Sequence, residues 1–315
     1  MIRAGMALLA LAVSQPALAD DRGADDWQLV WADEFDGTRV DRSKWSFAVD
    51  CWGGGNAERQ CYTASKRNAA VVDGKLVITA RRQRATGPAL PKSLRTAGTD
   101  PNAVVSRDFT SARLTTKGKA AWRYGRIEVR ARLPQGQGTW PAIWMLPEAD
   151  SYGRWAASGE IDILEAVNLG VACATCPGGR ESTILGTLHF GGVWPANAQK
   201  GTEVHAPEVL DGFHTYAIEW QPGRIIWQID GSTFAVREAR EWWSAGSTAP
   251  DAPFDQPFHL IVNLAIGGKL AETRGLGGVS DRDFPKQLAI DWVRVWQKGA
   301  GPATAGAGQA ERGDE

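Results

Sequence analysis

Short runs in which apolar and polar residues alternate recur along most of this chain, and they limit its possible folds more than any other feature. Successive side chains of a β-strand point to opposite faces, so this alternation is typical of strands with one buried face. Such runs span 75–80, 125–133, 215–220, 224–229 and 288–296. Turn residues separate them, including Asp230-Gly231 and many of the 36 glycines. Helical patterns are scarce, so the sequence predicts an all-β chain built as a β-sandwich.

The pattern also sets the domain organisation. The length is compatible with one large β domain or two ordinary ones. Alternation continues from Trp27 to Trp296 without a linker, so we expect one domain over residues 27–297. Residues 298–315 carry no large apolar side chain, and we expect a disordered tail there.

The N-terminus has the features of a secretory signal peptide. Arg3 precedes an apolar run over 4–13, and Ala17-Leu18-Ala19 offers small residues on both sides of one larger residue, as a cleavage site does. The run is too short to cross a bilayer, and no later segment is apolar enough for a membrane helix. We expect loss of residues 1–19, a short segment over 20–26, and a secreted protein, periplasmic or extracellular.

The charge balance argues against several kinds of partner. The sequence holds 35 basic and 36 acidic residues, a net charge of −1, and no basic run. Nucleic acids and acidic polymers are therefore poor candidates. We expect a monomer without nucleic-acid or membrane partners.

Four cysteines, Cys51, Cys61, Cys173 and Cys176, suggest disulfides in an exported protein. Four cysteines allow three pairings, and the sequence does not choose among them. The local options are Cys51 with Cys61 and Cys173 with Cys176. The C-x-x-C pair lacks the βαβ surroundings of a redox motif and the histidines of a zinc site. Bridges that staple loops are favoured, with free thiols as the alternative.

Three carboxylates, Glu160, Asp162 and Glu165, lie in one apolar segment that reads as a strand. Glu160 and Asp162 share a face, but a regular strand would point Glu165 into the core, where a charge is costly. A β-bulge near Leu164 would return Glu165 to the open face. The two glutamate carboxyls could then approach to about 5 Å, the separation of a retaining glycosidase pair. A solvated acidic face without chemistry is the alternative.

Further segments resemble the family 16 glycoside hydrolases, in the laminarinase-like branch with the motif E-x-D-x-x-E. The segments that carry the resemblance span 29–36, 56–63, 124–128, 140–147, 160–165, 186–192, 213–220 and 290–295. It implies a jelly roll, similar to concanavalin A, of two curved antiparallel sheets with a cleft across the concave face. By match to the motif, Glu160 is the nucleophile, Glu165 the acid/base, and Asp162 a hydrogen-bond partner that orients Glu160.

The substrate residues follow partly from chemistry and partly from the resemblance. Sugar rings stack on aromatic side chains, and Trp140, Trp144 and Trp155 precede the acidic strand, so we expect them to line the cleft rather than the core. By resemblance, His189 lines the acceptor side near the acid/base.

The segment that contains Asn56 and Glu58 matches a sugar-contacting segment of the family. Ala57 and Cys61 depart there from the Asn and Tyr frequent in the family.

The resemblance also implies a structural calcium at Glu34, Gly74 and Asp291, largely through backbone oxygens and the Asp291 carboxylate. The alternative is that Asp291 caps a strand end without a metal. No cofactor is expected for catalysis.

The expected activity is retaining hydrolysis of internal β-1,3 bonds in a laminarin-type β-glucan. Alternatives are a family 16 enzyme that acts on mixed-linkage β-glucan, agarose or carrageenan, a transglycosylase, and a β-glucan-binding protein without activity. The shorter E-x-D-x-E motif of lichenase-type relatives is absent, because the second glutamate is at position 165.

Overall fold

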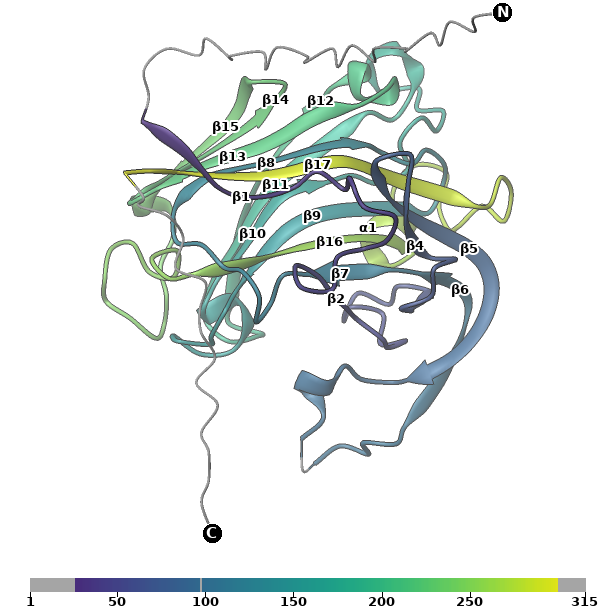
Figure 1. Cartoon of the computed structure of the whole chain (residues 1–315), viewed down its shortest axis with the longest axis horizontal. Helices are drawn as coiled ribbons and strands as arrows, with labels where there is room; N and C mark the ends of the chain where they lie inside the picture. Colours follow the sequence, from purple (N-terminus) through teal and green to yellow (C-terminus); the bar gives the residue numbers. More distant parts are fainter. Residues whose placement is uncertain (1–25, 97, 300–315) are drawn as a thin grey trace, which may run out of the picture.

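Two β-sheets make up the protein in a computed structural model that describes residues 26–96 and 98–299 (Figure 1). The predicted signal peptide lies outside the described residues, as do most of the predicted N-terminal segment and tail. Strands span Trp27 to Lys298, so the last strand extends one residue into the predicted tail. The all-β prediction is confirmed.

The larger sheet has ten strands, and it contains all five runs singled out in the sequence. Its main path is β15 (Ser232–Glu238), β14 (Arg224–Ile229), β13 (His214–Gln221), β8 (Gly125–Arg132), β17 (Lys286–Lys298), β5 (Lys75–Pro88), β6 (Val104–Ser111) and β3 (Gln60–Tyr62). Off this path, β1 (Trp27–Asp33) pairs with β17, and β4 (Ala69–Val72) with β5. All pairs are antiparallel except the short pair β3–β6. Asp230 and Gly231 both have positive φ, 49° and 79°, as the predicted hairpin turn requires.

The smaller sheet has seven strands and carries the acidic segment in its middle. Its order is β12 (Asn197–His205), β11 (Thr183–Gly191), β10 (Glu160–Glu165), β9 (Thr139–Pro147), β16 (Phe258–Ile266), β7 (Arg113–Thr115) and β2 (Ser46–Phe47). Helices are short: α1 (Lys269–Glu272) and the 3-10 turns η1 (Lys92–Leu94), η2 (Trp155–Ala157), η3 (Pro177–Gly179), η4 (Pro207–Leu210) and η5 (Ala239–Glu241). Within the described ranges, none is long and apolar enough to cross a membrane.

The hydrophobic core lies between the sheets and fixes the acidic strand from below. Trp227, from β14 of the larger sheet, is fully buried and donates its indole N–H to the backbone carbonyl of Asp162 at 2.8 Å. Its ring also fills the space over Gly186 in β11, where a Cβ would lie 2.6 Å from the ring. The Trp227 side chain therefore fixes the positions of β10 and β11 relative to the larger sheet.

Both local cysteine pairings are formed. Cys51 is bonded to Cys61, and Cys173 to Cys176. The first bridge closes the loop that leads to Asn56 and Glu58, so it limits the motion of one edge of the site described next.

Candidate active site

An extra residue in β10 brings the three acids to one face. Against β9, Asp162 pairs with Trp144 and Leu164 with Ile143, so β10 has one residue more than its neighbour. The register with β11 shifts over the same stretch. Ile163 and Leu164 are both buried in the core. Two consecutive inward residues change the parity of the strand, and the predicted bulge is confirmed.

Each glutamate accepts a hydrogen bond from one tryptophan. Trp155 Nε1 donates to Glu160 Oε2 at 2.7 Å, and Trp140 Nε1 donates to Glu165 Oε1 at 3.0 Å. Trp155 has an unusual positive φ of 46°. Strain of this kind is common at functional sites, and here it aims an indole at a carboxylate.

His189 lies opposite Glu160 in the neighbouring strand β11. Its Nε2 is 3.2 Å from Asp162 Oδ2 and 3.8 Å from Glu160 Oε1. The ion-pair partners of His189 are therefore Asp162 and Glu160, and its charge also lowers the pKa of Glu165; that it lines the acceptor side near the acid/base stays a prediction. The hydrogen bond expected between Asp162 and Glu160 stays a prediction.

Burial and mutual repulsion hold protons in the site. Burial, with the negative charge of Asp162, raises the pKa of Glu160 to about 7 and that of Glu165 to about 8. Burial opposes a charge on His189, but its contact with Asp162 and the charge of Glu160 outweigh this and raise its pKa to about 9. Near neutral pH, Glu165 therefore keeps its proton more strongly than Glu160, and His189 is a cation.

Two groups of side chains in the described ranges have metal-ligand spacing. Cys173, Cys176 and Glu181 form one, but both sulfurs are in a disulfide and no thiolate is free. Glu160, Asp162 and His189 form the other. The raised pKa of His189 favours its charged form, which pairs with Asp162 and Glu160 in this group.

Trp144 is the most accessible of the predicted tryptophans on β9. It lies beside Asp162 in the register, and its Nε1 donates to Asn263 Oδ1 at 2.7 Å. The guanidinium of Arg113 lies 5.3 Å from the centre of its ring. Trp140 is only 8% exposed, packed among Val167, Ala265 and their neighbours, so it serves Glu165 more than it offers an open ring.

The loop with Asn56 and Glu58 reaches the site, but its two residues differ in access. Asn56 is exposed, and its carbonyl accepts the Lys269 N–H at 2.8 Å. Glu58 is 4% exposed and accepts hydrogen bonds from Gln60 Nε2 at 2.7 Å and Tyr62 OH at 3.3 Å. The Glu58 carboxylate therefore holds its own loop together through these hydrogen bonds, and it is not accessible to a ligand.

Arg113, Asn263 and Trp227 join the site although the sequence did not single them out. They lie on β7, β16 and β14, and in the sequence they are 47, 98 and 62 positions from the nearest residue of β10. Their sequence surroundings carry no signal of their own. Only the pairing of strands distant in sequence brings them to β9 and β10.

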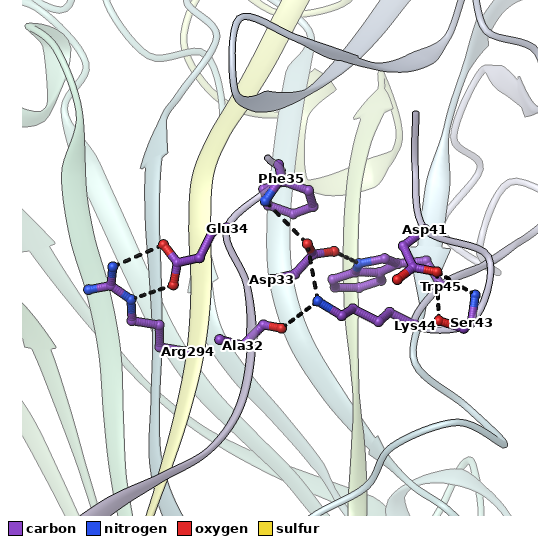
Figure 2. Close-up of polar contacts among 9 residues, drawn as sticks. All are labelled: Ala32, Asp33, Glu34, Phe35, Asp41, Ser43, Lys44, Trp45 and Arg294. Carbon is purple, nitrogen blue, oxygen red and sulfur yellow. Dashed lines mark hydrogen bonds and ion pairs between the residues drawn. The ribbon is translucent and has the colours of Figure 1, made fainter. Parts of the chain in front are cut away.

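The positions expected to hold calcium carry cations of the protein itself. Figure 2 shows the Glu34 side chain directed at Arg294. Arg294 Nε donates to Glu34 Oε1 at 2.8 Å, and its Nη2 donates to Glu34 Oε2 at 2.9 Å. The neighbouring Asp33 turns the other way, towards Trp45 and Lys44. The Asp291 carboxylate pairs with Arg130 and lies 4.0 Å from Lys75 Nζ.

Gly74 occupies the turn between β4 and β5, with a φ of 69°. Calcium needs six to eight oxygen ligands, and both carboxylates already face cations. The expected site draws mainly on the backbone oxygens of Glu34 and Gly74, which side-chain ion pairs do not engage, so the structural calcium stays a prediction.

A β-sandwich with two glutamates of raised pKa on one face of a bulged strand defines the class of the protein as a glycoside hydrolase. Residues 57–294 match the family model of the glycosyl hydrolases family 16. The chain belongs to this family.

Several relatives cover most of the chain. A beta-glucanase of Rhodothermus marinus is 41% identical over 310 residues, which are 94% of this chain and 95% of the relative. Glucan endo-1,3-beta-glucosidase A1 of Niallia circulans is 39% identical over 86% of this chain, but the chain spans 38% of that longer protein. The X-ray structure of the laminarinase from Rhodothermus marinus superposes with a TM-score of 0.69 at 40% identity and covers 86% of this chain and 97% of the laminarinase. The predicted family and jelly-roll fold are confirmed.

Proposed function

We propose that this protein is a retaining endo-hydrolase of internal β-1,3-glucosidic bonds in laminarin-type β-glucans. The observation that carries the proposal is the bulge in β10, which turns Glu160 and Glu165 to the same face with different proton affinities. Retention requires such a pair on one face of the site, one ionised and one protonated.

In the proposed reaction, Glu160 attacks the anomeric carbon while Glu165 gives its proton to the departing glycosidic oxygen. The covalent glycosyl ester removes the charge of Glu160, which lowers the pKa of Glu165. Glu165 then takes a proton from water as that water attacks the ester, and both carboxyls return to their first state. Trp155 and the cationic His189 stabilise the ionised form of Glu160 before attack.

The choice of a neutral β-1,3-glucan rests on chemistry and on relatives. Trp144 offers a partly exposed ring next to Asp162, suited to the C–H face of a sugar. The relatives named above include a glucan endo-1,3-beta-glucosidase and a laminarinase. A sulfated polysaccharide would favour an excess of cations, whereas the chain carries a net charge of −1.

A panel of polysaccharides with a reducing-end assay tests the substrate. Laminarin or curdlan should be cleaved fastest, mixed-linkage β-glucan more slowly, and agarose and carrageenan not at all. A faster reaction on agarose or carrageenan would overturn the substrate and leave the glutamate roles standing. Products that contain only transferred, lengthened oligosaccharides would indicate the transglycosylase instead.

Proton NMR of the first product tests the stereochemistry separately. The β-anomer should appear before mutarotation, because the proposed mechanism inverts the anomeric carbon twice. An initial α-anomer would rule out Glu160 as the nucleophile.

We also propose that the protein is exported after loss of residues 1–19 and acts as a monomer. The support is the signal-like N-terminus described above. Sequencing of protein secreted into the periplasm or medium should begin at Asp20. An intact Met1 on cytoplasmic protein would contradict export.

A further inference from the structure

Three tryptophans stand out because water reaches them. Trp155, Trp194 and Trp243 are 36%, 72% and 50% exposed, and no other tryptophan in residues 26–96 and 98–299 reaches that level. Exposed aromatic patches usually mark a binding surface. The three rings come from separate loops, so their gathering has to be established contact by contact.

The first link runs from the catalytic acids to Trp155 and along β11. Trp155 binds Glu160, and its ring centre lies 5.7 Å from that of His189. Gly191 follows His189 by two residues in β11, so both point to the same face of the sheet. The exposed surface beyond His189 is therefore the surface over Gly191.

Trp243 covers this surface. A Cβ at Gly191 would lie 3.0 Å from the Trp243 ring, so only glycine lets the indole rest on the strand. Backbone bonds fix the contact: the Gly191 N–H donates to the Trp243 carbonyl at 2.9 Å, and the Ala245 N–H donates to the Gly191 carbonyl at 2.8 Å.

Trp194 lies in the turn that leaves β11. The Ala196 N–H donates to the Val193 carbonyl at 2.9 Å and closes the turn. The Val193 side chain reaches within 3.7 Å of the Cβ position of Gly153, two residues before Trp155. The turn therefore packs against the loop that carries Trp155, and Trp194 lies at the exposed end of the turn.

The loops that carry Trp155 and Trp243 are held together below the rings. Ser244 Oγ donates to the Ala157 carbonyl at 2.6 Å in a buried position. Ser158 Oγ donates to the Gly153 carbonyl at 2.5 Å and accepts the Tyr152 N–H at 2.9 Å. A supported set of rings loses little freedom when a ligand binds.

We propose that Trp155, Trp194 and Trp243 form an aromatic platform that holds further sugar units of the glucan beyond His189, outside the two catalytic glutamates. This inference rests on the proposed function. An enzyme that cuts inside a chain must hold sugars on both sides of the broken bond. Trp144 and Arg113 lie on the β9 side of the three acids and can contact sugars there. The platform is the corresponding surface on the β11 side.

The occupant we infer is neutral glucan because the platform is continuous with the site through Trp155 and His189. A second copy of the protein is the competing occupant. Sedimentation of wild type at assay concentration distinguishes them: a monomer is expected. A dimer that Trp194→Ala converts to a monomer would overturn the proposal.

Kinetics of Trp194→Ala and Trp243→Ala, alone and combined, test the platform. On long laminarin, KM should rise about tenfold for the double variant, the scale of lost aromatic contacts, while kcat stays near wild type. On the shortest laminari-oligosaccharide that the enzyme cleaves, both constants should be unchanged, because few sugars reach the platform. Trp155 is left intact because it also binds Glu160.

Trp292→Ala is the matched control, since its partly buried ring lies under Arg294 on the larger sheet. Melting temperatures of all variants exclude misfolding, and Trp194, the most exposed ring, provides the test if Trp243→Ala fails to fold. Variants with the control's KM on laminarin would overturn the platform alone. Wild-type protein inactive on laminarin would refute the proposed function and the platform with it.

Discussion

Acidic side chains of the two sheets have opposite surroundings. On the larger sheet, Asp291 pairs with Arg130, and Arg126 lies between Glu128 and Glu219, at 2.8 and 2.6 Å. On the smaller sheet, His189 is the ion-pair partner of both Glu160 and Asp162. In the described part of the chain, no arginine or lysine lies within ion-pair distance of Glu160 or Glu165.

Tryptophan is common to both surroundings and so does not explain the difference. Trp296 donates to Glu128 at 2.9 Å, just as Trp155 and Trp140 donate to Glu160 and Glu165. A neutral donor fixes an oxygen in place, whereas a cation also holds the group ionised. The comparison teaches that acids of the larger sheet are neutralised locally, whereas Glu160 and Glu165 are positioned by hydrogen bonds but left with raised pKa values, as the proposed reaction requires.

The largest effect on the rate is expected when acids of the two sheets are replaced in turn. Glu160→Gln and Glu165→Gln should each lower the rate on laminarin by roughly three or more decades, because a nucleophile or a general acid is lost. Glu34→Gln, paired with Arg294 on the other sheet, should leave kcat within about twofold if its role is only a local ion pair. Initial rates with matched melting curves check this, and a Glu160→Gln enzyme within tenfold of wild type would mean that the reactive strand has been misassigned.

A smaller effect is expected where an aromatic ring binds substrate. Trp144→Ala should weaken glucan binding by roughly 1–3 kcal/mol, the scale of an aromatic contact and its buried area. Calorimetric titration of glucan into the Glu160→Gln background measures binding without turnover. Trp292→Ala, on the other sheet, is the control, and equal losses in both variants would remove Trp144 from the site.

The pH dependence of the rate tests the role of His189, the histidine next to the acids of β10. In wild type, kcat/KM should fall on the acid side as Glu160 gains a proton near its pKa of about 7, and on the alkaline side as Glu165 loses one near its pKa of about 8. The His189 cation lowers the pKa of both glutamates, so His189→Ala should move both limbs to higher pH. Rates from pH 5 to 10 measure this, with His214→Ala, on the larger sheet, as the control whose limbs should not move. Limbs that stay in place in His189→Ala would indicate a neutral histidine.

The smallest effect is expected for the ion pairs of the larger sheet. Glu34→Gln should cost about 0.2–1 kcal/mol of unfolding free energy, because the pair with Arg294 is partly exposed and water screens it. Urea unfolding at low and high salt should show a smaller loss at high salt. The same assay with and without EDTA tests the expected structural calcium, because chelation lowers the midpoint of a protein that a bound metal stabilises. A midpoint that falls in EDTA would support the calcium, and an unchanged midpoint would leave only the ion pairs of Glu34 and Asp291.

The sequence predicted those parts of the site that depend on local parity. The odd spacing between Glu160 and Glu165 was enough to predict the bulge, because a charge cannot be left in the core. Motif context located His189 but not its partners, since its distance to Asp162 depends on the pairing of β10 with β11.

The parts that the sequence could not provide are contacts between distant elements. Trp227 reaches the Asp162 carbonyl from the opposite sheet, 65 positions away, and Arg294 reaches Glu34 across 260 positions. Glu58 was expected to contact sugar, yet it is buried under side chains of its own loop. Burial and long-range pairing are properties of the packed fold, and no periodicity in the sequence encodes them.

The bulge in β10 also affects how this strand tolerates change in length. The Ile163 side chain is apolar and buried in the core, so replacing it with another apolar residue should change activity little. Deleting it would restore regular alternation with an even spacing between the two glutamates, so Glu160, Asp162 and the glutamate after Leu164 would still lie on one face. Substitution scanning would therefore rate this position as unimportant, and a one-residue deletion would remove the bulge without separating the two glutamates, whereas the same six residues in regular alternation would turn Glu165 towards the core.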